Sequence, residues 1–190
     1  MAFADLIDLR TAVIELVRNP SITDVFPRLV KLVEANFNRR LRCREMMATE
    51  LMVPSQGVAP LPYDFQEAIG VFDATGHEWI AQPPQVKPQR GYYSISGNDV
   101  LTGSDEDLTL QYYAQIPSLT LNQTVPNWLL QKAPGLYLYA VGAEAAKYLR
   151  DVETATATSQ MAEMEYTAVM GEADAQRYAR SRVRVSGVTP

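Results

Sequence analysis

The stretch Leu110–Asp151, LQYYAQIPSLTLNQTVPNWLLQKAPGLYLYAVGAEAAKYLRD, decides the fold of this 190-residue chain. It opens with an aromatic, strand-like run that stops at Pro117, and a polar loop follows. A short apolar segment, Asn127–Leu130, then leads to a helix that is rich in alanine and begins at Pro134, a position where proline is favoured. The stretch therefore predicts the point at which the chain returns from strands to helices.

Helical periodicity dominates both ends of the chain. Residues 5–18 keep one apolar face and have an aspartate at their start that can serve as N-cap, and Asn19-Pro20 ends the helix. A second helix is expected to begin with Asp24 as its N-cap, so that the two form an antiparallel hairpin. The last helix is predicted over Thr156 to about Arg182, continuing through Gly171 at a cost of about 1 kcal/mol relative to alanine.

Short strand-like runs occupy the middle of the chain. The segment Leu41–Val53 is ambiguous between helix and strand. After it come runs rich in β-branched and aromatic residues, separated by turn signals. These runs are Ile69–Phe72, Glu78–Ala81, Tyr92–Ser96 and Asp107–Gln115. Their spacing predicts a small antiparallel sheet.

Segregated helices and strands of this kind are typical of an α+β fold. The expected architecture is mainly a helical bundle, formed by N-terminal helices in residues 1–40 and C-terminal helices in residues 117–182. A small antiparallel β-rich insertion is expected at residues 41–116. Residues 183–190 lack a helical period and are expected to be an extended tail.

The composition narrows the class of protein. One cysteine, Cys43, excludes an intrachain disulfide, so a reducing compartment such as the cytoplasm suits folding. No apolar run approaches the roughly 20 residues that span a bilayer, and the N-terminus does not have the pattern of a signal peptide. We therefore expect no membrane association. The formal net charge of −5 argues against a surface that binds nucleic acid everywhere.

Motifs for catalysis are absent from the sequence. His77 is the only histidine, and neither a phosphate-binding glycine loop nor a nucleophile elbow is present. The acidic run 105–107 is interpreted as a solvated hairpin turn. Glu163 and Glu165 could coordinate a cation with Asp174, although a wet helix face is the plainer interpretation. We expect no catalytic residue, cofactor or metal.

Two arginine clusters and several aromatic residues are candidates for binding. The clusters consist of Arg39, Arg40, Arg42 and Arg44, and of Arg177, Arg180, Arg182 and Arg184. Either cluster could contact phosphates or acidic patches on a protein, and protein partners are favoured because stacking aromatics are not interleaved with the arginines. The simplest alternative is that the arginines bind no partner and lie in solvent at the C-terminal ends of helices, where positive charge is favourable. A packing role at the return to the helical bundle is expected for Trp128, Leu129, Tyr137 and Tyr139.

Several segments, in the same order, resemble the head-to-tail adaptor (head-completion or connector) proteins of tailed bacteriophages, with the short-tailed phages as the expected group. They are VFPRLVKLVEANFNRRLRCREM at 25–46, LPYDF at 61–65, YYAQIPSL at 112–119, NWLL at 127–130 and the tyrosine-bearing helix from Pro134. The resemblance covers most of residues 5–150. The last helix lacks a tryptophan often seen in such proteins, and the tail is short.

The resemblance implies a structural virion protein of the neck region. Such proteins form a ring, typically a dodecamer, below the portal protein, extend the channel for genomic double-stranded DNA, and provide the platform for tail or nozzle proteins. By resemblance, the segment from Arg177 onward, with Arg180, Arg182, Arg184 and Val185, would contact the portal. The mildly acidic surface suits a channel past which DNA slides without specific binding.

Three other functions remain open on the sequence alone. The chain could be another neck, stopper or tail-completion protein. It could be a helical protein that binds nucleic acid through its arginines, in which case substitution of Arg39 and Arg40 would abolish binding. It could also be an enzyme with a carboxylate site, which would show metal-dependent turnover.

Overall fold

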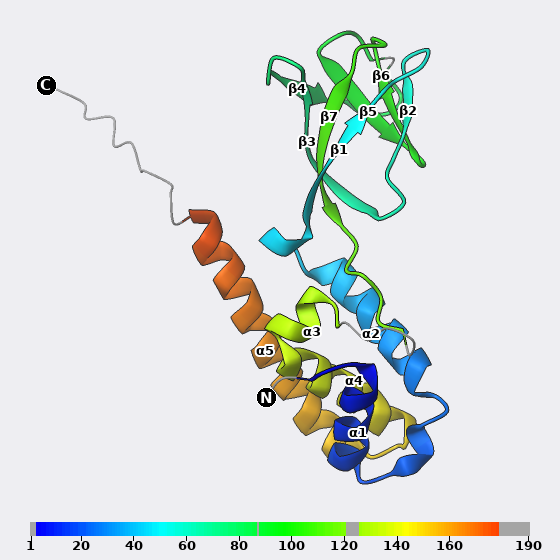
Figure 1. Cartoon of the computed structure of the whole chain (residues 1–190), viewed down its shortest axis with the longest axis vertical. Helices are drawn as coiled ribbons and strands as arrows, with labels where there is room; N and C mark the ends of the chain where they lie inside the picture. Colours follow the sequence, from blue (N-terminus) through cyan, green and yellow to red (C-terminus); the bar gives the residue numbers. More distant parts are fainter. Residues whose placement is uncertain (1–2, 87, 121–125, 179–190) are drawn as a thin grey trace, which may run out of the picture. The chain divides into compact units, whose positions relative to one another are not determined.

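The chain forms two compact units in the computed structural model, which describes residues 3–86, 88–120 and 126–178. Unit 1 combines the chain up to Glu45 with the chain from Ile116 onward, and unit 2 comprises Met46–Gln115. Unit 1 is helical and unit 2 carries the strands (Figure 1). The second unit is therefore inserted into the first.

In the described part of unit 1 there are five α-helices and a 3-10 helix, and a second 3-10 helix spans the boundary between the units. They are α1 (Leu6–Val17), η1 (Pro20–Ile22), α2 (Phe26–Arg40), η2 (Arg44–Met46), α3 (Trp128–Lys132), α4 (Pro134–Tyr148) and α5 (Val152–Tyr178). The helix α4 is central, because α1, α2, α3 and α5 all pack against it.

The helix ends follow local chemistry in most places. Asp5 caps α1 by accepting a hydrogen bond from the Asp8 N–H at 2.8 Å, as the sequence predicts. Pro134 stands at the start of α4, which is also confirmed. The prediction of Asp24 as the cap of the second helix is wrong, because α2 begins at Phe26 and its N-cap residue Val25 makes no side-chain cap bond.

Small residues on α4 allow close packing of helices in unit 1. A Cβ atom added at Gly142 would lie 2.6 Å from Cδ2 of Leu16 on α1 and 3.8 Å from Cγ2 of Thr158 on α5. Ala145 and Ala146, on the same helix, are completely buried. Three helices therefore come close together at Gly142, where a larger side chain would displace the end of the Leu16 side chain.

Seven strands form one sheet in unit 2. They are β1 (Met47–Met52), β2 (Val58–Pro60), β3 (Phe65–Asp73), β4 (Glu78–Ala81), β5 (Tyr92–Ser96), β6 (Asp99–Thr102) and β7 (Leu108–Ala114). Their order in the sheet is β1-β7-β3-β4-β5-β6-β2. Neighbouring strands are antiparallel except for β4 and β5, which are parallel. The core includes Val71, Trp79, Val100, Leu108 and Leu110.

The predicted fold, mainly a helical bundle with a small antiparallel insertion, is wrong. The structure is α+β with a seven-stranded mixed sheet. The ambiguous segment before Val53 contributes β1, and the proline-flanked Val58–Pro60 contributes β2. The parallel pairing of β4 with β5 follows from the connection between them, and alternation within a strand carries no information about it.

No helix among the described residues is both long enough and apolar enough to cross a membrane.

Candidate functional site

The residues predicted to pack at the return to the helices lie on α3 and α4. Leu129 and Tyr137 are completely buried, whereas Trp128 and Tyr139 are half-buried. Tyr137 meets Phe37 of α2 edge to face, with ring centroids 5.2 Å apart. Whether these residues form a functional junction stays a prediction.

The predicted portal contact lies almost wholly beyond the described residues. Arg177 belongs to the last turn of α5, but its side chain is not described. Arg180, Arg182, Arg184 and Val185 lie outside the described residues. Their role remains a proposal.

A buried carboxylate, Glu34 of α2, is the main polar feature inside unit 1. Only 2% of Glu34 is exposed. Its Oε1 accepts hydrogen bonds from the Leu119 N–H at 2.8 Å and from the Tyr137 hydroxyl at 3.2 Å. Its Oε2 is buried without a hydrogen-bond partner among the described residues. The group is thus satisfied on one oxygen only.

Three side chains of unit 1 hold the backbone of the segment Ile116–Leu119, which we call the strap. Besides Glu34, Asn38 accepts a hydrogen bond from the Ile116 N–H at 2.8 Å, and Asn127 donates to the Pro117 carbonyl at 2.7 Å. Because Glu34 and Asn38 are four residues apart, they lie on the same face of α2. The strap is therefore fixed by side chains in place of a strand or helix ladder.

The surroundings of Glu34 change the acidity of two groups. Burial raises the pKa of Glu34, and the hydrogen bond from the Leu119 N–H opposes that rise without cancelling it. Burial also raises the pKa of Tyr137, and the charge of Glu34 acts in the same direction. The Asn127 amide donates to the Tyr137 oxygen at 2.9 Å. Both groups therefore hold their protons more tightly in the folded protein than they would in water.

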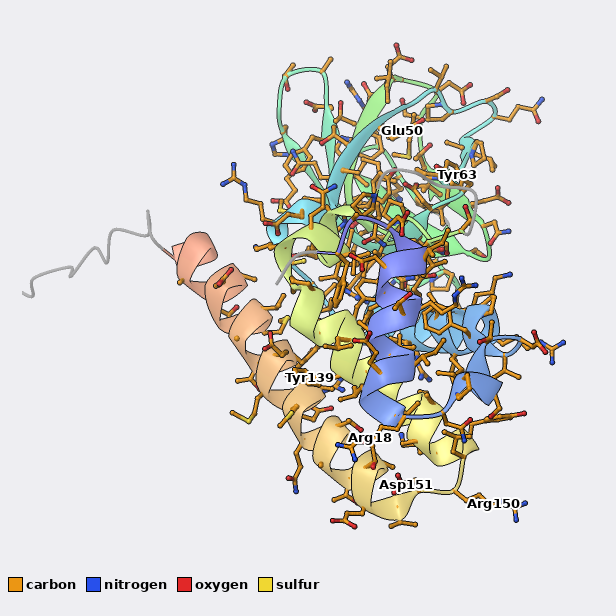
Figure 2. The ribbon with its side chains drawn as sticks, turned by 60° about the horizontal axis from the view of Figure 1, so that its bottom comes forward. Arg18, Glu50, Tyr63, Tyr139, Arg150 and Asp151 are labelled. Carbon is orange, nitrogen blue, oxygen red and sulfur yellow. The ribbon has the colours of Figure 1, made fainter. Side chains whose placement is uncertain are left out.

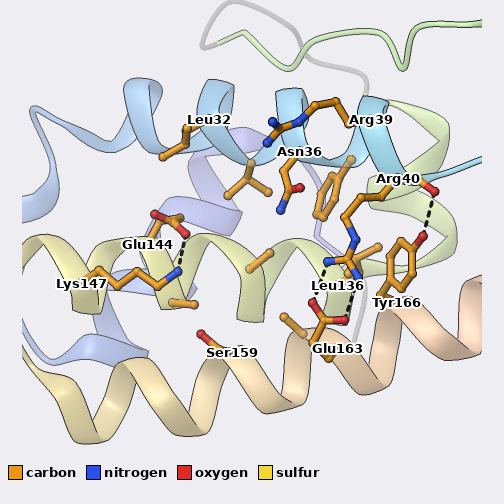
Figure 3. A pocket seen from close by; sticks show the side chains of 15 residues that line it. Leu32, Asn36, Arg39, Arg40, Leu136, Glu144, Lys147, Ser159, Glu163 and Tyr166 are labelled. Atoms are coloured by element: carbon orange, nitrogen blue, oxygen red, sulfur yellow. Dashed lines mark hydrogen bonds and ion pairs between the residues drawn. The ribbon is translucent and has the colours of Figure 1, made fainter. Parts of the chain in front are cut away.

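A cavity of about 320 Å³ lies between α2, α4 and α5 (Figure 3). Arg40, at the end of α2, donates two hydrogen bonds to the Glu163 carboxylate of α5, at 2.6 and 2.8 Å. The Arg40 guanidinium also stacks 4.0 Å from the ring centre of Tyr166, whose hydroxyl donates to the Arg40 carbonyl at 2.7 Å. Arg40 thus braces α2 against α5.

Charged contacts also tie α3 and α5 to the end of the N-terminal segment. Lys132 donates a hydrogen bond to Glu45 at 2.7 Å and lies 3.6 Å from Glu172. The hydrogen bond to Glu45 raises the pKa of Lys132. At the opposite end of α4, Arg150 has a left-handed backbone (φ 60) and Asp151 accepts from the Thr154 N–H, so the chain reverses into α5 there (Figure 2).

The carboxylates that the sequence offered as candidates have structural partners or lie apart. Asp105 accepts from the Gly57 N–H at 2.6 Å, and Glu106 pairs with Arg90 at 3.0 Å. Glu163 pairs with Arg40, and the Glu165 carboxylate packs over Gly135. Among the residues that the structure describes, no group of three or more His, Cys, Asp and Glu is arranged to hold a metal ion.

Formal charge is divided unevenly between the two units. Unit 2 contains nine acidic and two basic residues, which gives −7, whereas the rest of the chain contains 13 acidic and 15 basic residues, which gives +2. The basic residues of the C-terminal segment contribute to the second figure. The arrangement therefore presents an acidic sheet unit and a mildly basic helical unit.

Sequence reasoning missed Glu34 and Asn38. A signal was present, because Glu34 stands within the apolar stripe formed by Val30, Val33 and Phe37, where a charged residue is unexpected. Arg40 was assigned to a solvent-facing or partner-facing cluster, and its contact with α5 depends on residues 123 positions away in the sequence.

Two comparisons with known proteins bear on the identity of the chain. No curated protein matches it. The sequence profile of the family described as SU10 adaptor protein matches residues 3–186, which is nearly the whole chain and includes both units. This protein therefore belongs to the SU10 adaptor protein family and is a structural adaptor of bacteriophages.

Proposed function

We propose that the protein assembles as a ring, expected to be a dodecamer, below the phage portal, extends the DNA channel and offers the platform on which the tail is attached. The family match over residues 3–186 carries this proposal. The packing of α1, α2, α3 and α5 against α4 supports it, since a compact helical unit suits a subunit that is repeated in an assembly. Copies in a ring would place unit 2 at a regular repeat.

The mass of the complex with the portal protein tests whether the adaptor forms a ring. Native mass spectrometry of the purified protein, alone and with purified portal rings, should show a portal complex that carries one adaptor ring of about twelve subunits. A monomer in isolation agrees with the proposal, because assembly can depend on the portal template. A complex with only one or two adaptor copies per portal ring would refute it.

Portal binding is proposed for the C-terminal segment that starts at Arg177. This segment has four arginines and no acidic residue, and it begins in the last turn of the long helix α5. Deletion of residues 183–190 should weaken binding to portal rings at least tenfold in surface plasmon resonance. Deletion of 187–190, which keeps every arginine, is the matched control and should bind like the full chain. Unchanged binding after the larger deletion would contradict a portal contact in this segment.

Double-stranded DNA is proposed to pass without tight binding. The formal charge of −7 on unit 2 repels phosphate, and Arg40 is already engaged by Glu163. A gel-shift assay at physiological salt should show only micromolar or weaker duplex affinity. Nanomolar affinity that falls on substitution of Arg39 would favour the nucleic-acid-binding alternative.

A further inference from the structure

Strand β1 lies at one edge of the sheet in unit 2. In the sheet, β1 pairs with β7 on one side and is the last strand on the other. Its six residues extend from Met47 to Met52, and among the described residues their only ladder partner is β7. Alternate residues of an edge strand point backbone N–H and C=O groups outward, so β1 offers unpaired hydrogen-bonding groups.

Apolar side chains line the same strand. Met47 is 51% exposed and Leu51 is 63% exposed, and Val53, just beyond the strand, is also 63% exposed. The pairs Met47 with Tyr113 and Leu51 with Thr109 place these side chains on one face of the sheet, because alternate residues share a face. The opposite face of β1 carries Met52, which is buried in the core. The exposed face therefore has apolar area to bury on a partner.

The other edge of the sheet, β2, is protected in the usual ways. It has only three residues, Val58–Pro60, and it ends in a proline that has no N–H to donate. β1 contains neither proline nor lysine. Natural sheets usually protect edges with proline, lysine or a very short strand, so the longer β1 edge, which lacks all three, is the one suited to accept a strand.

Charge selects the kind of strand that fits. Glu50 is the only charged residue of β1 and is exposed (Figure 2), and unit 2 as a whole carries a formal charge of −7. A second copy of β1 would bring like charges together and is disfavoured. A strand with basic residues would instead face a complementary surface.

We propose that β1 binds an extended, positively charged segment of a partner protein, which adds to the sheet of unit 2 as a further strand. Main-chain hydrogen bonds to the free edge would supply affinity. Apolar side chains of the segment would cover Met47 and Leu51, and basic side chains would meet Glu50. This binding does not depend on ring formation or on the portal contact, because it uses unit 2 alone.

The experiment uses the full-length protein and a fluorescein-labelled peptide of eight residues that alternates valine and arginine. Fluorescence anisotropy measures binding, and hydrogen–deuterium exchange identifies the amides that become protected. We expect saturable binding and slower exchange in β1, with no change in β2. A peptide that alternates valine and glutamate should bind at least tenfold more weakly. Two further peptides carry the valine–arginine sequence with N-methyl groups on alternate residues, either the odd or the even ones. Only one of these two sets of amides would face β1, so only that N-methylated peptide should bind at least tenfold more weakly.

Variants of the two edges separate strand addition from general attraction. Leu51→Lys places a guard residue on β1 and should weaken peptide binding at least tenfold, whereas Val58→Lys adds the same charge to β2 and should leave binding within twofold. Glu50→Gln should weaken binding several-fold. Circular dichroism checks the fold of each variant, and the methylated peptides test the proposal on the unaltered protein.

Several results would overturn the proposal. Equal loss of affinity in Leu51→Lys and Val58→Lys would show that only charge matters. Equal binding of both N-methylated frames and the parent peptide would exclude main-chain pairing. Protection confined to amides outside β1, or no binding by the unmodified peptide at millimolar concentration, would show that this edge does not accept a basic strand.

Discussion

Replacement of Glu34 gives the sharpest test of how unit 1 is held together. In Glu34→Ala, the Leu119 N–H loses its buried acceptor and the Tyr137 hydroxyl loses one of its partners. Each buried donor left without a partner costs about 1–3 kcal/mol. Removal of a carboxylate whose Oε2 is unsatisfied offsets part of this loss. We expect the free energy of unfolding to fall by about 2–4 kcal/mol.

The neutral isostere Glu34→Gln keeps the accepting oxygen and removes the buried charge. Its free energy of unfolding should stay within about 1 kcal/mol of wild type near neutral pH, because the lost charge and the retained acceptor act in opposite directions. Glu15→Gln, an exposed substitution on α1, is the matched control and should change stability by less than about 0.5 kcal/mol.

The contribution of Glu34 to the free energy of unfolding depends on pH in a predictable direction. Because burial raises the pKa of Glu34, the folded state binds that proton more tightly than the unfolded chain does. Protonation therefore stabilises the fold, and stability is lost as pH rises from the ordinary carboxyl pKa through the raised value. Each unit of pKa difference contributes about 1.4 kcal/mol. Glu34→Gln lacks this contribution.

Urea titrations followed by circular dichroism at 222 nm, at a series of pH values, measure the effect. The difference in unfolding free energy, wild type minus Glu34→Gln, should become more negative as pH rises through that window and then level off. A difference that is independent of pH, or one that becomes more positive, would refute the assignment of Glu34 as a buried carboxyl with a raised pKa.

Three further substitutions test the packing of unit 1 by thermal and urea denaturation. Gly171→Ala should stabilise α5 by about 1 kcal/mol, because no heavy atom lies within 4 Å of the added Cβ, and a loss would show that the helix is not regular there. Gly142→Ala should change stability by less than about 1 kcal/mol, because the added Cβ displaces the end of the flexible Leu16 side chain while alanine favours the helix, and a loss above about 2 kcal/mol would show that Leu16 cannot move aside. Arg40→Lys should cost less than about 1 kcal/mol, an effect that shrinks in 1 M salt, because the pair with Glu163 is largely exposed. A loss above about 2 kcal/mol would mean that the pair is shielded from solvent.

The features of unit 1 that the sequence predicts correctly are those that depend on residues close together in the sequence. The cap at Asp5, the proline at the start of α4 and the continuation of α5 through Gly171 all follow from chemistry within one or two turns. The second helix shows the limit of this approach. Asp24 is a good capping residue, but the helix starts later, at Phe26, which is completely buried.

The sheet and the internal contacts could not be predicted in the same way. The parallel pair β4–β5 is set by the connection between the strands, and β2 was not among the predicted strands because it is short and ends in a proline. The partner of Glu34, Leu119, is 85 residues away, so the strap could not be inferred from spacing. Glu34 itself was visible in the sequence as a charged residue within an apolar stripe, and a charged residue on a buried face requires a hydrogen-bond partner.

The insertion of unit 2 has a mechanical consequence. The chain passes between the units twice, at Glu45–Met46 and at Gln115–Ile116, so a force on unit 2 is shared between two segments of the backbone. Just beyond these segments β1 and β7 pair with each other, from Met47 with Tyr113 to Met52 with Leu108. A load that separates their ends must break this ladder one rung at a time. Removal of unit 2 from unit 1 by force therefore requires both connections to be extended, with the β1–β7 ladder opening from the end nearest them.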